Sequence, residues 1–474
     1  MRLSATDSAG LPTADWVDEF LLKGPAQQIC LRLSEPVDRA TLRRLVIERQ
    51  SRLVEAGLRA GGAAALRLPP SLAYLVDLLA VWRTGAQAVL LDHRLTDYEV
   101  DQALRRLAPQ VLIRARRTTG AALQVFFDVE EEIVRLGADP AGSQHAVIQL
   151  SSGSTGPAKV IGRGAADLVA EVRRYTGIDG VPAPGERVIL LPSVVHVLGL
   201  VGGLLFGLHT GVELQPPSRL SGEAILHAVS AHDTPATVLG VPFHVGLLTS
   251  TDQTRRLGQL RRMTIGGEPV PAVTASTFED RFGVPLGTMY GMTETGVIAT
   301  DLHGRHRPGV MPAPGMQIRE VAGELWVSCP ASPYVGDSEN PRWSDGWLRT
   351  RDAGLVDPDS GLVTVRGRLD SQVSVGGLKI DLTEVEWAIT ALPGVAAAVV
   401  VHDGEITAYV QPVGDMTVDG FNQTLGERLA RYKMPRRVRI LDQLPRTTTG
   451  KVVRDPSVLR QAVGAASPGR SASR

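Results

Sequence analysis

The chain has 474 residues, and its 50 Lys and Arg residues equal its 50 Asp and Glu residues. The zero net charge argues against a nucleic-acid or anionic-membrane binder and against an acidic disordered protein. The apolar fraction of 43% indicates a large core. Two cysteines, Cys30 and Cys329, provide neither a disulfide framework nor a cysteine-based zinc site, so we expect a cytoplasmic location.

Apolar runs in the first 300 residues predict alternating helices and strands. Residues 1–15 lack the apolar core of a secretory signal. Helices are expected at 41–60, 71–84 and 97–106, and strands at 86–91, 110–113, 145–150, 187–191, 236–241, 262–265 and 286–289. Short apolar strands separated by helix-length segments favour a mostly parallel α/β sheet.

One uncharged stretch, between Arg187 and Glu213, is long enough to span a bilayer. It contains Pro192, several glycines and two histidines. We therefore favour a buried strand followed by a buried helix, and a membrane span is the alternative.

The pattern changes near residue 308, where short alternating strands begin. Strands are expected at 316–321, 324–328, 362–366 and 372–375, then a helix at 382–392, strands at 396–402 and 405–411, a helix at 419–431 and a strand at 437–441. The predicted fold class is α/β, with a large N-terminal domain (1–368) of mostly parallel sheets and a small distorted β-barrel subdomain. A small mobile α+β domain (369–463) and a disordered tail (464–474) are expected to follow.

The first motif, residues 151–159, reads Ser-Ser-Gly-Ser-Thr-Gly-Pro-Ala-Lys and follows a predicted strand. Glycines let backbone N–H groups turn toward an anion, hydroxyls donate hydrogen bonds, and Lys159 adds charge. The pattern predicts a phosphate-binding loop, and a flexible surface turn is the alternative. It is not the common nucleotide-binding loop, because Val160 follows the lysine where Ser or Thr would contact magnesium.

Two further motifs carry carboxylates. The second, residues 289–296, reads Met-Tyr-Gly-Met-Thr-Glu-Thr-Gly, and the third, residues 347–354, reads Trp-Leu-Arg-Thr-Arg-Asp-Ala-Gly. Carboxylates and hydroxyls at the carboxyl edge of a parallel sheet lie where such folds bind ligands. The alternatives are a helix start capped by Thr293 or Thr295, and a plain turn at Asp352.

The last two motifs lie in the predicted small domain or at its start. The fourth, residues 367–386, begins Gly-Arg-Leu-Asp and contains Val-Gly-Gly-Leu-Lys at 375–379. The fifth, residues 445–454, reads Pro-Arg-Thr-Thr-Thr-Gly-Lys-Val-Val-Arg. Lys451 in this loop is either a solvated charge or a mobile cation that meets a phosphate.

In this order and spacing, the five motifs resemble those of the adenylate-forming superfamily, and they are most similar to acyl-CoA synthetases. The resemblance extends from Trp82 to Arg454. It implies a large N-terminal domain, a swivelling C-terminal domain and a hinge at Asp370. It also implies two half-reactions: a carboxylic acid and MgATP give acyl-AMP and pyrophosphate, and a thiol then attacks the acyl carbon.

The resemblance implies roles for individual residues. Lys451, Glu294, Thr293 and His196 are expected to be catalytic, with Glu294 also the magnesium ligand. ATP and AMP are expected to bind Ser151, Ser152, Gly153, Ser154, Thr155, Gly156, Lys159, Gly267, Glu268, Tyr290, Gly291, Met292, Thr293, Asp352 and Arg368. The acyl pocket is expected at His196, Val197, Gly199, Val241, Gly266, Gly291, Gly296 and Val297, and the CoA channel at Gly376, Gly377 and Lys379.

Several positions differ from the family pattern or have a simpler explanation. Ala158 and Val160 flank Lys159 where the family has Pro and Gly, and Arg351 stands where the family has Gly. His196 could be an ordinary core histidine. Lysine is rare, with five among the 50 basic residues, and four of the five, Lys159, Lys379, Lys433 and Lys451, lie in segments that match the family.

The substrate is predicted from a missing charge. From Val188 to Val212 there is no Asp or Glu to pair with an α-ammonium, and an unpaired buried ammonium would cost several kcal/mol. We therefore expect a fatty, aryl or polycyclic acid rather than an α-amino acid. CoA is the expected acceptor because of the glycine-rich 375–379 stretch, and the phosphopantetheine of a carrier protein is the alternative.

Two other classes compete with this interpretation. A non-catalytic relative would bind nucleotide only, and a kinase would transfer phosphate without releasing pyrophosphate. The sequence decides neither the oligomeric state, monomer or homodimer, nor the identity of the acid.

Overall fold

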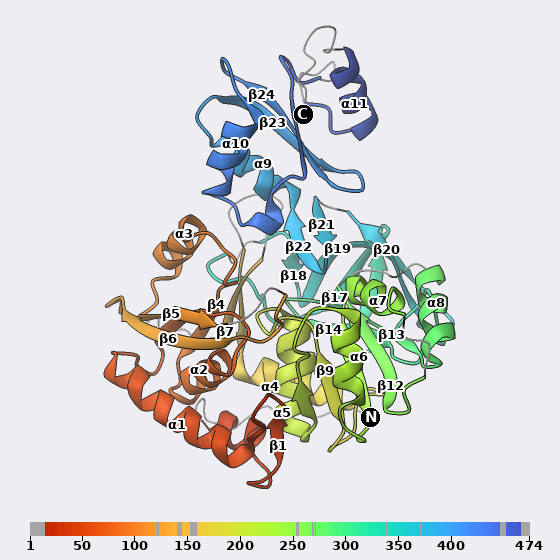
Figure 1. Cartoon of the computed structure of the whole chain (residues 1–474). Coiled ribbons are helices and arrows are strands. Elements are labelled where there is room, and N and C mark those ends of the chain that lie inside the picture. The colour runs from red at the N-terminus through yellow and green to blue at the C-terminus, as the bar shows by residue number, and fades with distance from the viewer. Residues whose placement is uncertain are drawn as a thin grey trace. The chain divides into compact units, whose positions relative to one another are not determined.

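The computed structural model describes residues 15–119, 123–139, 145–151, 159–252, 256–267, 270, 272–337, 340–369, 371–445 and 452–465. Its contacts divide the chain into two compact units. The first comprises residues 1–93, 107–150 and 160–369, and the second comprises 94–106, 151–159 and 370–474. The sheets and helices confirm the predicted α/β class, with parallel sheets in the large unit and a small α+β arrangement in the other (Figure 1).

The largest sheet of the first unit has nine strands in the order β15-β14-β13-β12-β11-β9-β10-β1-β2. The strands β13, β12, β11, β9, β10 and β1 run parallel to one another, whereas β14, β15 and β2 pair with the sheet in antiparallel fashion. Their bounds are β1 Ile29–Leu31, β2 Val37–Asp38, β9 Arg187–Leu190, β10 Glu213–Gln215, β11 Ala236–Gly240, β12 Leu260–Gly266, β13 Leu286–Met292, β14 Gly296–Asp301 and β15 Met311–Pro312.

Both faces of this sheet are covered, which explains why β9 is apolar throughout its centre. Val188 and Leu190 pack into one hydrophobic cluster, and Ile189 packs into another on the opposite face. The helices α6, α7 and α8 supply the second cluster, and α4 supplies the first (Figure 1). These helices span α4 Ala165–Thr176, α6 Gly222–Ser230, α7 Pro242–Thr249 and α8 Ala272–Phe282.

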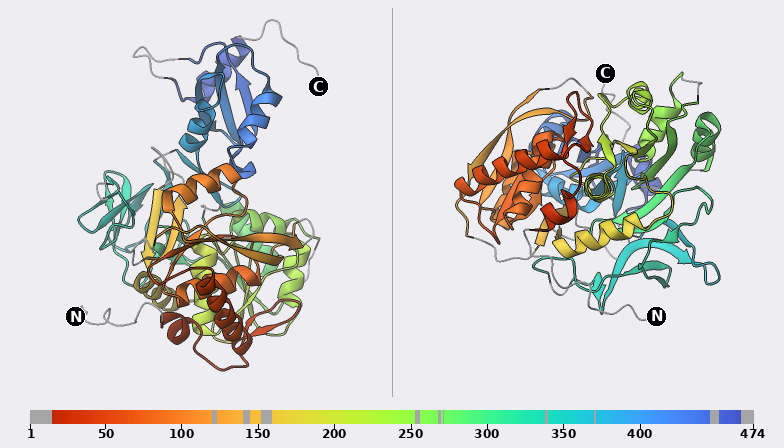
Figure 2. Two further views of the ribbon diagram at one scale, coloured as in Figure 1. Left: turned by 90° about the vertical axis from the view of Figure 1, so that its left-hand side faces the viewer. Right: turned by 90° about the horizontal axis from the view of Figure 1, so that it is seen from below.

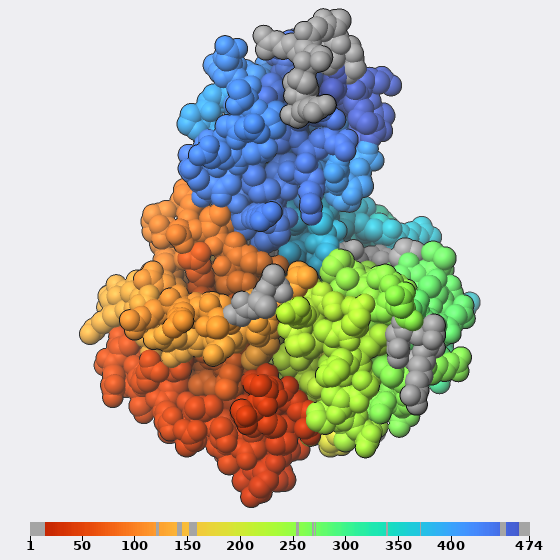
Figure 3. All heavy atoms as spheres, viewed as in Figure 1, coloured from red at the N-terminus to blue at the C-terminus, as the bar shows by residue number. Residues whose placement is uncertain are grey.

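A second sheet of this unit has six strands in the order β6-β5-β3-β4-β7-β8. Trp82 on α2 donates its indole N–H to the carbonyl oxygen of Ala146 on β7 at 2.7 Å, which ties the helix to the sheet. In the space-filling view these N-terminal segments, red and orange, meet the lime-green segments that follow β9 along one face (Figure 3). The bounds are α1 Arg39–Glu55, α2 Leu72–Arg83, β3 Ala63–Arg67, β4 Gln87–Leu90, β5 Val111–Thr119, β6 Asp128–Arg135, β7 His145–Ser151 and β8 Lys159–Gly164; α3, Asp97–Leu107, belongs almost wholly to the second unit.

The predicted β-barrel subdomain takes the form of a five-stranded antiparallel sheet. Its strands follow the order β16-β17-β19-β18, and β20 also pairs with β19, at residues 352–356. The bounds are β16 Ile318–Val321, β17 Glu324–Ser328, β18 Trp343–Ser344, β19 Trp347–Val356 and β20 Val363–Arg368. Side chains alternate along β19, so Thr350 and Asp352 are buried on the face opposite to Arg349 and Arg351.

The second unit is built around the sheet β23-β24-β25 (Figure 2). Alternate residues of β23 face two clusters, with Ala398 and Val400 against α9 and α10, and Val399 and Val401 against α11. Lys433 is buried in this unit, and its ammonium lies 2.7 Å from Glu384 Oε1. The bounds are β21 Gln372–Val375, β22 Leu378–Asp381, α9 Leu382–Thr390, β23 Val395–His402, β24 Ile406–Pro412, α10 Val418–Gly426, β25 Arg437–Ile440 and α11 Pro456–Ala465.

Some predicted elements differ in extent. α1 ends at Glu55, short of the predicted residue 60, because Gly57 and Gly61 take positive φ angles that end a helix. The helix expected after β9 is a π-helix at Leu198–Leu205 that continues as α5 at Phe206–Thr210. Among the described residues, no helix is long and apolar enough to cross a membrane.

Candidate functional site

The second motif forms a turn between two antiparallel strands. Residues 293–295 connect the carboxyl end of β13 to β14, so the alternative of a capped helix start is wrong. Gly296 has φ 76°, and a Cβ on it would lie within 2 Å of the Glu171 carboxylate. A Cβ on Gly291 would lie 2.5 Å from the carbonyl oxygen of Gly296. The backbone therefore accounts for both glycines, and their assignment to the acyl pocket stays a prediction.

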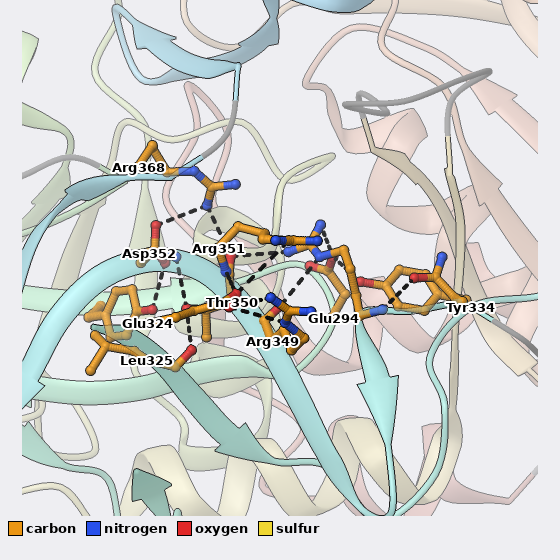
Figure 4. Close-up of polar contacts among 12 residues, drawn as sticks. Glu294, Glu324, Leu325, Tyr334, Arg349, Thr350, Arg351, Asp352 and Arg368 are labelled. Atoms are coloured by element: carbon orange, nitrogen blue, oxygen red, sulfur yellow. Dashed lines mark hydrogen bonds and ion pairs between the residues drawn. The ribbon is translucent and has the colours of Figure 1, made fainter. Parts of the chain in front are cut away.

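Asp352 is the point at which three motifs meet in the first unit. Its Oδ2 accepts a hydrogen bond from the hydroxyl of Tyr290 at 2.6 Å, and its Oδ1 accepts one from Arg368 Nη1 at 3.0 Å (Figure 4). Asp352 and Arg368 are partners in the β19–β20 ladder, whereas Tyr290 comes from β13. Burial and the charge of Asp352 raise the pKa of the Tyr290 hydroxyl well above its usual range. The three side chains therefore form one connected polar group.

Arg351 stands where the family has a glycine, and contacts with Glu324 hold its backbone in the conformation of that turn. Its backbone adopts the left-handed region, with φ 62°, which a β-carbon disfavours. Its amide N–H donates to Glu324 Oε1 at 3.0 Å, and Arg349 donates to Glu324 Oε2 from Nε at 3.0 Å and from Nη2 at 2.8 Å. The buried carboxylate of Glu324 thus holds the backbone turn that carries Asp352.

Glu294 lies in the turn after β13 with its side chain buried. Its Oε1 accepts a hydrogen bond from the Tyr334 hydroxyl at 3.1 Å, and Arg342 Nη1 lies 3.7 Å from the same oxygen. No group in the described part of the chain donates to Oε2. Burial, followed by the charge of Glu294, raises the pKa of Tyr334, so the hydroxyl keeps its proton as a donor.

This arrangement fits a magnesium ion that is shared with substrate phosphates. Mg²⁺ at phosphate sites is commonly held by one or two carboxylates together with phosphate oxygens and water. Glu294 offers one such oxygen, Oε2, because both of its contacts fall on Oε1. A site built wholly from protein ligands is not seen, since the described residues contain no cluster of three or more His, Cys, Asp or Glu side chains.

His196 lies just before the π-helix and is partly exposed. Its Nε2 is 3.6 Å from Asp92 Oδ2, and Asp92 Oδ1 is 3.6 Å from His93 Nδ1. The residues between Val188 and Val212 contain no acid, but the fold brings this buried carboxylate to His196 from the end of β4. The prediction of a substrate without an α-ammonium considered only residues 188–212, and it therefore leaves out the carboxylate of Asp92 near His196.

Three other predicted pocket residues lie in the nine-stranded sheet or directly after one of its strands. Val241 follows β11, Gly266 ends β12 and pairs with Met289 of β13, and Val297 lies buried on β14. Val197 precedes the π-helix, and a Cβ on Gly199 would lie 2.4 Å from the carbonyl oxygen of Ser193, which explains that glycine by backbone packing. Gly267 has φ 95° directly after β12.

The remaining predicted residues are placed only in part. Ser151 ends β7 and Lys159 begins β8, and the residues between them, Ser152 to Ala158, lie outside the described residues together with Glu268, Asp370 and Lys451. In the second unit, Gly376 and Gly377 have φ 58° and 81° and form the turn of the β21–β22 hairpin, and Lys379 is exposed on β22. Thr293 lies in the turn of the second motif, next to Met292 at the end of β13.

No pattern in the sequence marks several residues that hold the site. From strands or loops outside the five motifs, Tyr334 and Arg342 contact the predicted site residue Glu294, and Glu324 binds the third motif at Arg351. Glu171 on α4 is another, since its Oε1 accepts a hydrogen bond from Val297 N at 3.1 Å and its carboxylate pairs with buried Arg163. Only tertiary structure brings these residues together, so no local pattern marks them.

Comparison with known proteins gives consistent matches. Residues 47–328 match the family model described as AMP-binding enzyme, and residues 384–451 match that of the AMP-binding enzyme C-terminal domain. The chain is 29% identical to the p-hydroxybenzoic acid–AMP ligase FadD22 of Mycobacterium tuberculosis over 84% of its own length and 61% of that protein. It therefore spans about three-fifths of the length of that relative.

Two other matches span most of both chains. A feruloyl-CoA synthase from Amycolatopsis is 30% identical, covering 88% of this chain and 92% of the relative. The o-succinylbenzoate CoA synthetase of Bacillus subtilis has a similar fold, with a TM-score of 0.81, 23% identity, and coverage of 94% of this chain and 98% of that one.

Proposed function

Since this chain belongs to the AMP-binding enzyme family, we propose that it activates a carboxylic acid with ATP and transfers the acyl group to the thiol of CoA. In the first half-reaction a carboxylate oxygen bonds to the α-phosphorus, the bond from that phosphorus to the bridging oxygen breaks, and pyrophosphate leaves. In the second, the thiol gives up its proton, its sulfur bonds to the acyl carbon, the bond from that carbon to the phosphate oxygen breaks, and AMP leaves. The two halves make the protein an AMP-forming acid–thiol ligase.

The observation that carries the proposal is the connected group of Tyr290, Asp352 and Arg368. A carboxylate fixed by two donors keeps lone pairs for further hydrogen bonds, which suits the two hydroxyls of a ribose. Tyr290, which binds Asp352, lies near the carboxyl end of β13 beside β12, and parallel α/β sheets bind ligands at such ends. We therefore assign the ribose to Asp352 and Arg368, and the adenine to the neighbourhood of Tyr290 and Gly267.

The remaining roles rest on the motifs. We propose that residues 151–159 bind the β- and γ-phosphates, that Thr293 contacts the α-phosphate, and that Glu294 holds Mg²⁺, which would neutralise phosphate charge when bound. Lys451 is proposed to bridge the attacking carboxylate and the α-phosphate, where a compact ammonium fits between two anions. The boundaries 1–368 and 369–463, and a swing of the smaller part about Asp370, belong to the same proposal.

The acid is proposed to be apolar and to lack an α-ammonium. The p-hydroxybenzoic acid–AMP ligase and the feruloyl-CoA synthase are both named for aromatic acids, which favours an aryl acid among the three predicted classes. Because Asp92 brings a buried carboxylate to within 3.6 Å of His196, this choice rests on the relatives rather than on the missing charge in residues 188–212. The location is proposed to be cytoplasmic, and both cysteines are free and buried.

A carrier-protein phosphopantetheine is the second candidate acceptor. It is favoured by one observation: the relative from Mycobacterium tuberculosis is named an AMP ligase rather than a CoA ligase. The test is to incubate the protein with MgATP and aryl acids, with either CoA or a phosphopantetheinylated carrier protein, and to identify products by mass spectrometry. AMP with acyl-CoA supports the proposal, AMP with acylated carrier supports the second candidate, and ADP would refute both.

A further inference from the structure

In the connection between β17 and β18, residues 329–342, residues 333–335 pair with β8, the strand that follows the first motif. Tyr334 forms an antiparallel bridge with Ile161 on β8. On either side of it, Gly162 N donates to the carbonyl oxygen of Pro333 and Val335 N donates to that of Val160, both at 2.9 Å. Backbone hydrogen bonds therefore set the position of Tyr334 relative to β8.

The same connection supplies both partners of Glu294. The Tyr334 hydroxyl donates to Glu294 Oε1 at 3.1 Å, and the guanidinium of Arg342 lies 3.7 Å from that oxygen. All three side chains are buried, with Tyr334 6% exposed, Arg342 7% and Glu294 8%. A buried carboxylate needs such partners, because leaving its charge unpaired away from water is costly.

Arg342 also reaches the turn that carries Asp352. Its Nη2 donates to the carbonyl oxygen of Thr350 at 3.1 Å, and its Nε donates to that of Arg349 at 3.3 Å. Arg368, which pairs with Asp352, also donates to the Thr350 carbonyl oxygen, at 3.3 Å (Figure 4). The planar guanidinium therefore links the Glu294 carboxylate to the backbone that positions Asp352.

We propose that Tyr334 and Arg342 are positioning residues for the nucleotide and its Mg²⁺. They hold Glu294 by Oε1 and so leave Oε2 for the cation, which Glu294 would hold when Mg²⁺ is bound, and Arg342 fixes this carboxylate relative to the ribose-binding turn. Partners of a metal-binding carboxylate commonly change metal affinity tenfold or more when they are removed. The inference rests on the roles proposed above for Glu294 and Asp352.

The test measures nucleotide binding, so it does not depend on turnover. Calorimetry gives the affinity for α,β-methylene-ATP with Mg²⁺ and with EDTA, and the affinity for AMP in EDTA. The variants are Tyr334→Phe, which removes only the hydroxyl, and Arg342→Lys, which keeps the charge but cannot reach Glu294 and both carbonyl oxygens. Matched controls are Tyr175→Phe, in a buried ring on α4, and Arg281→Lys, whose Nη1 donates to the Thr249 carbonyl oxygen at 2.9 Å.

In Tyr334→Phe we expect the gain in affinity from Mg²⁺ to fall about tenfold, while AMP binding in EDTA stays within about twofold of wild type. In Arg342→Lys we expect both quantities to fall, because the link to the Asp352 turn is lost as well. The controls should retain the wild-type values.

Two results in Tyr334→Phe would overturn the proposal. One is an undiminished gain in affinity from Mg²⁺. The other is a loss of AMP affinity in EDTA as large as the loss of that gain, together with lower thermal stability, which would indicate a merely structural role. Failure of the proposed function has another signature. The wild type would then catalyse no acid-dependent release of pyrophosphate, while the Mg²⁺-dependent gain and its loss in Tyr334→Phe would persist.

Discussion

Arg351 has a left-handed backbone with φ 62°, and its amide N–H donates a hydrogen bond to the buried Glu324 Oε1 at 3.0 Å. The bond stabilises a conformation that most residues with a side chain avoid. It also places the next residue, Asp352, where Tyr290 and Arg368 reach its carboxylate. An arginine at a position that the family reserves for glycine therefore preserves the turn.

The strain at Arg351 predicts an order of stabilities. Arg351→Gly should be more stable than Arg351→Ala by about 1 kcal/mol, because alanine keeps the left-handed strain and glycine does not. Urea unfolding of the two variants measures the difference. Equal stabilities, or a more stable alanine variant, would contradict the assignment of strain to this residue.

Removing the charge of Asp352 should weaken nucleotide binding. Asp352→Asn keeps the size of the side chain but loses a charged acceptor, and hydrogen bonds to charged groups contribute about 1.5–3 kcal/mol. We expect AMP affinity to fall by roughly 10- to 100-fold in calorimetry. Asp359→Asn, at an exposed turn of the same antiparallel subdomain, is the control and should bind AMP like the wild type.

His244 predicts a loss of stability in mild acid. Burial lowers the pKa of His244 to about 4, and its Nδ1 accepts a hydrogen bond from Val241 N at 3.0 Å. Below pH 6.5 the unfolded chain takes up a proton that the folded protein refuses until about pH 4. The protonation of His244 in the unfolded chain therefore lowers the free energy of unfolding by about 3 kcal/mol as the pH drops from 6.5 to about 4.

A variant isolates this contribution. Burial raises the pKa of Asp77 to about 7, which acts in the opposite direction over the same range, so the wild type alone does not report on His244. His244→Gln should lose less stability than the wild type between pH 7 and pH 4.5 in urea unfolding. Parallel losses in the two proteins would disprove the role of His244.

Lys451 should matter in only one half-reaction. Lys451→Ala is expected to abolish formation of acyl-AMP and to spare thioester formation from preformed acyl-AMP, because the ammonium is proposed to act only at the α-phosphate transfer. Lys23→Ala, at the exposed lysine outside the matched segments, is the control. Equal loss of both half-reactions would show that the assigned role is wrong.

The sequence was informative where a local pattern determines structure. The apolar runs at 236–241 and 286–289 predicted strands β11 and β13, since parallel strands buried on both faces must be apolar. The end of α1 was missed because the helical pattern continues past Gly57, whose positive φ ends the helix. Local patterns therefore located elements better than their ends.

The candidate site divides in the same way. Asp352, Arg368 and Tyr290 were selected from motifs, and the structure brings them into contact. Tyr334 and Arg342 lie outside the motifs, because they meet Glu294 only through the connection 329–342, in which residues 333–335 pair with β8. Contacts of this kind depend on tertiary packing and leave no periodic or composition signal.

The most direct test of the central claim is acid-dependent exchange of labelled pyrophosphate into ATP. The measurement covers a panel of fatty, aryl and polycyclic acids, with α-amino acids as the comparison. We predict exchange that requires an apolar acid, is fastest with an aryl acid, and is absent with amino acids and in Lys451→Ala. Absence of exchange with every acid, or release of ADP in place of pyrophosphate, would contradict the claim that this protein forms acyl-adenylates.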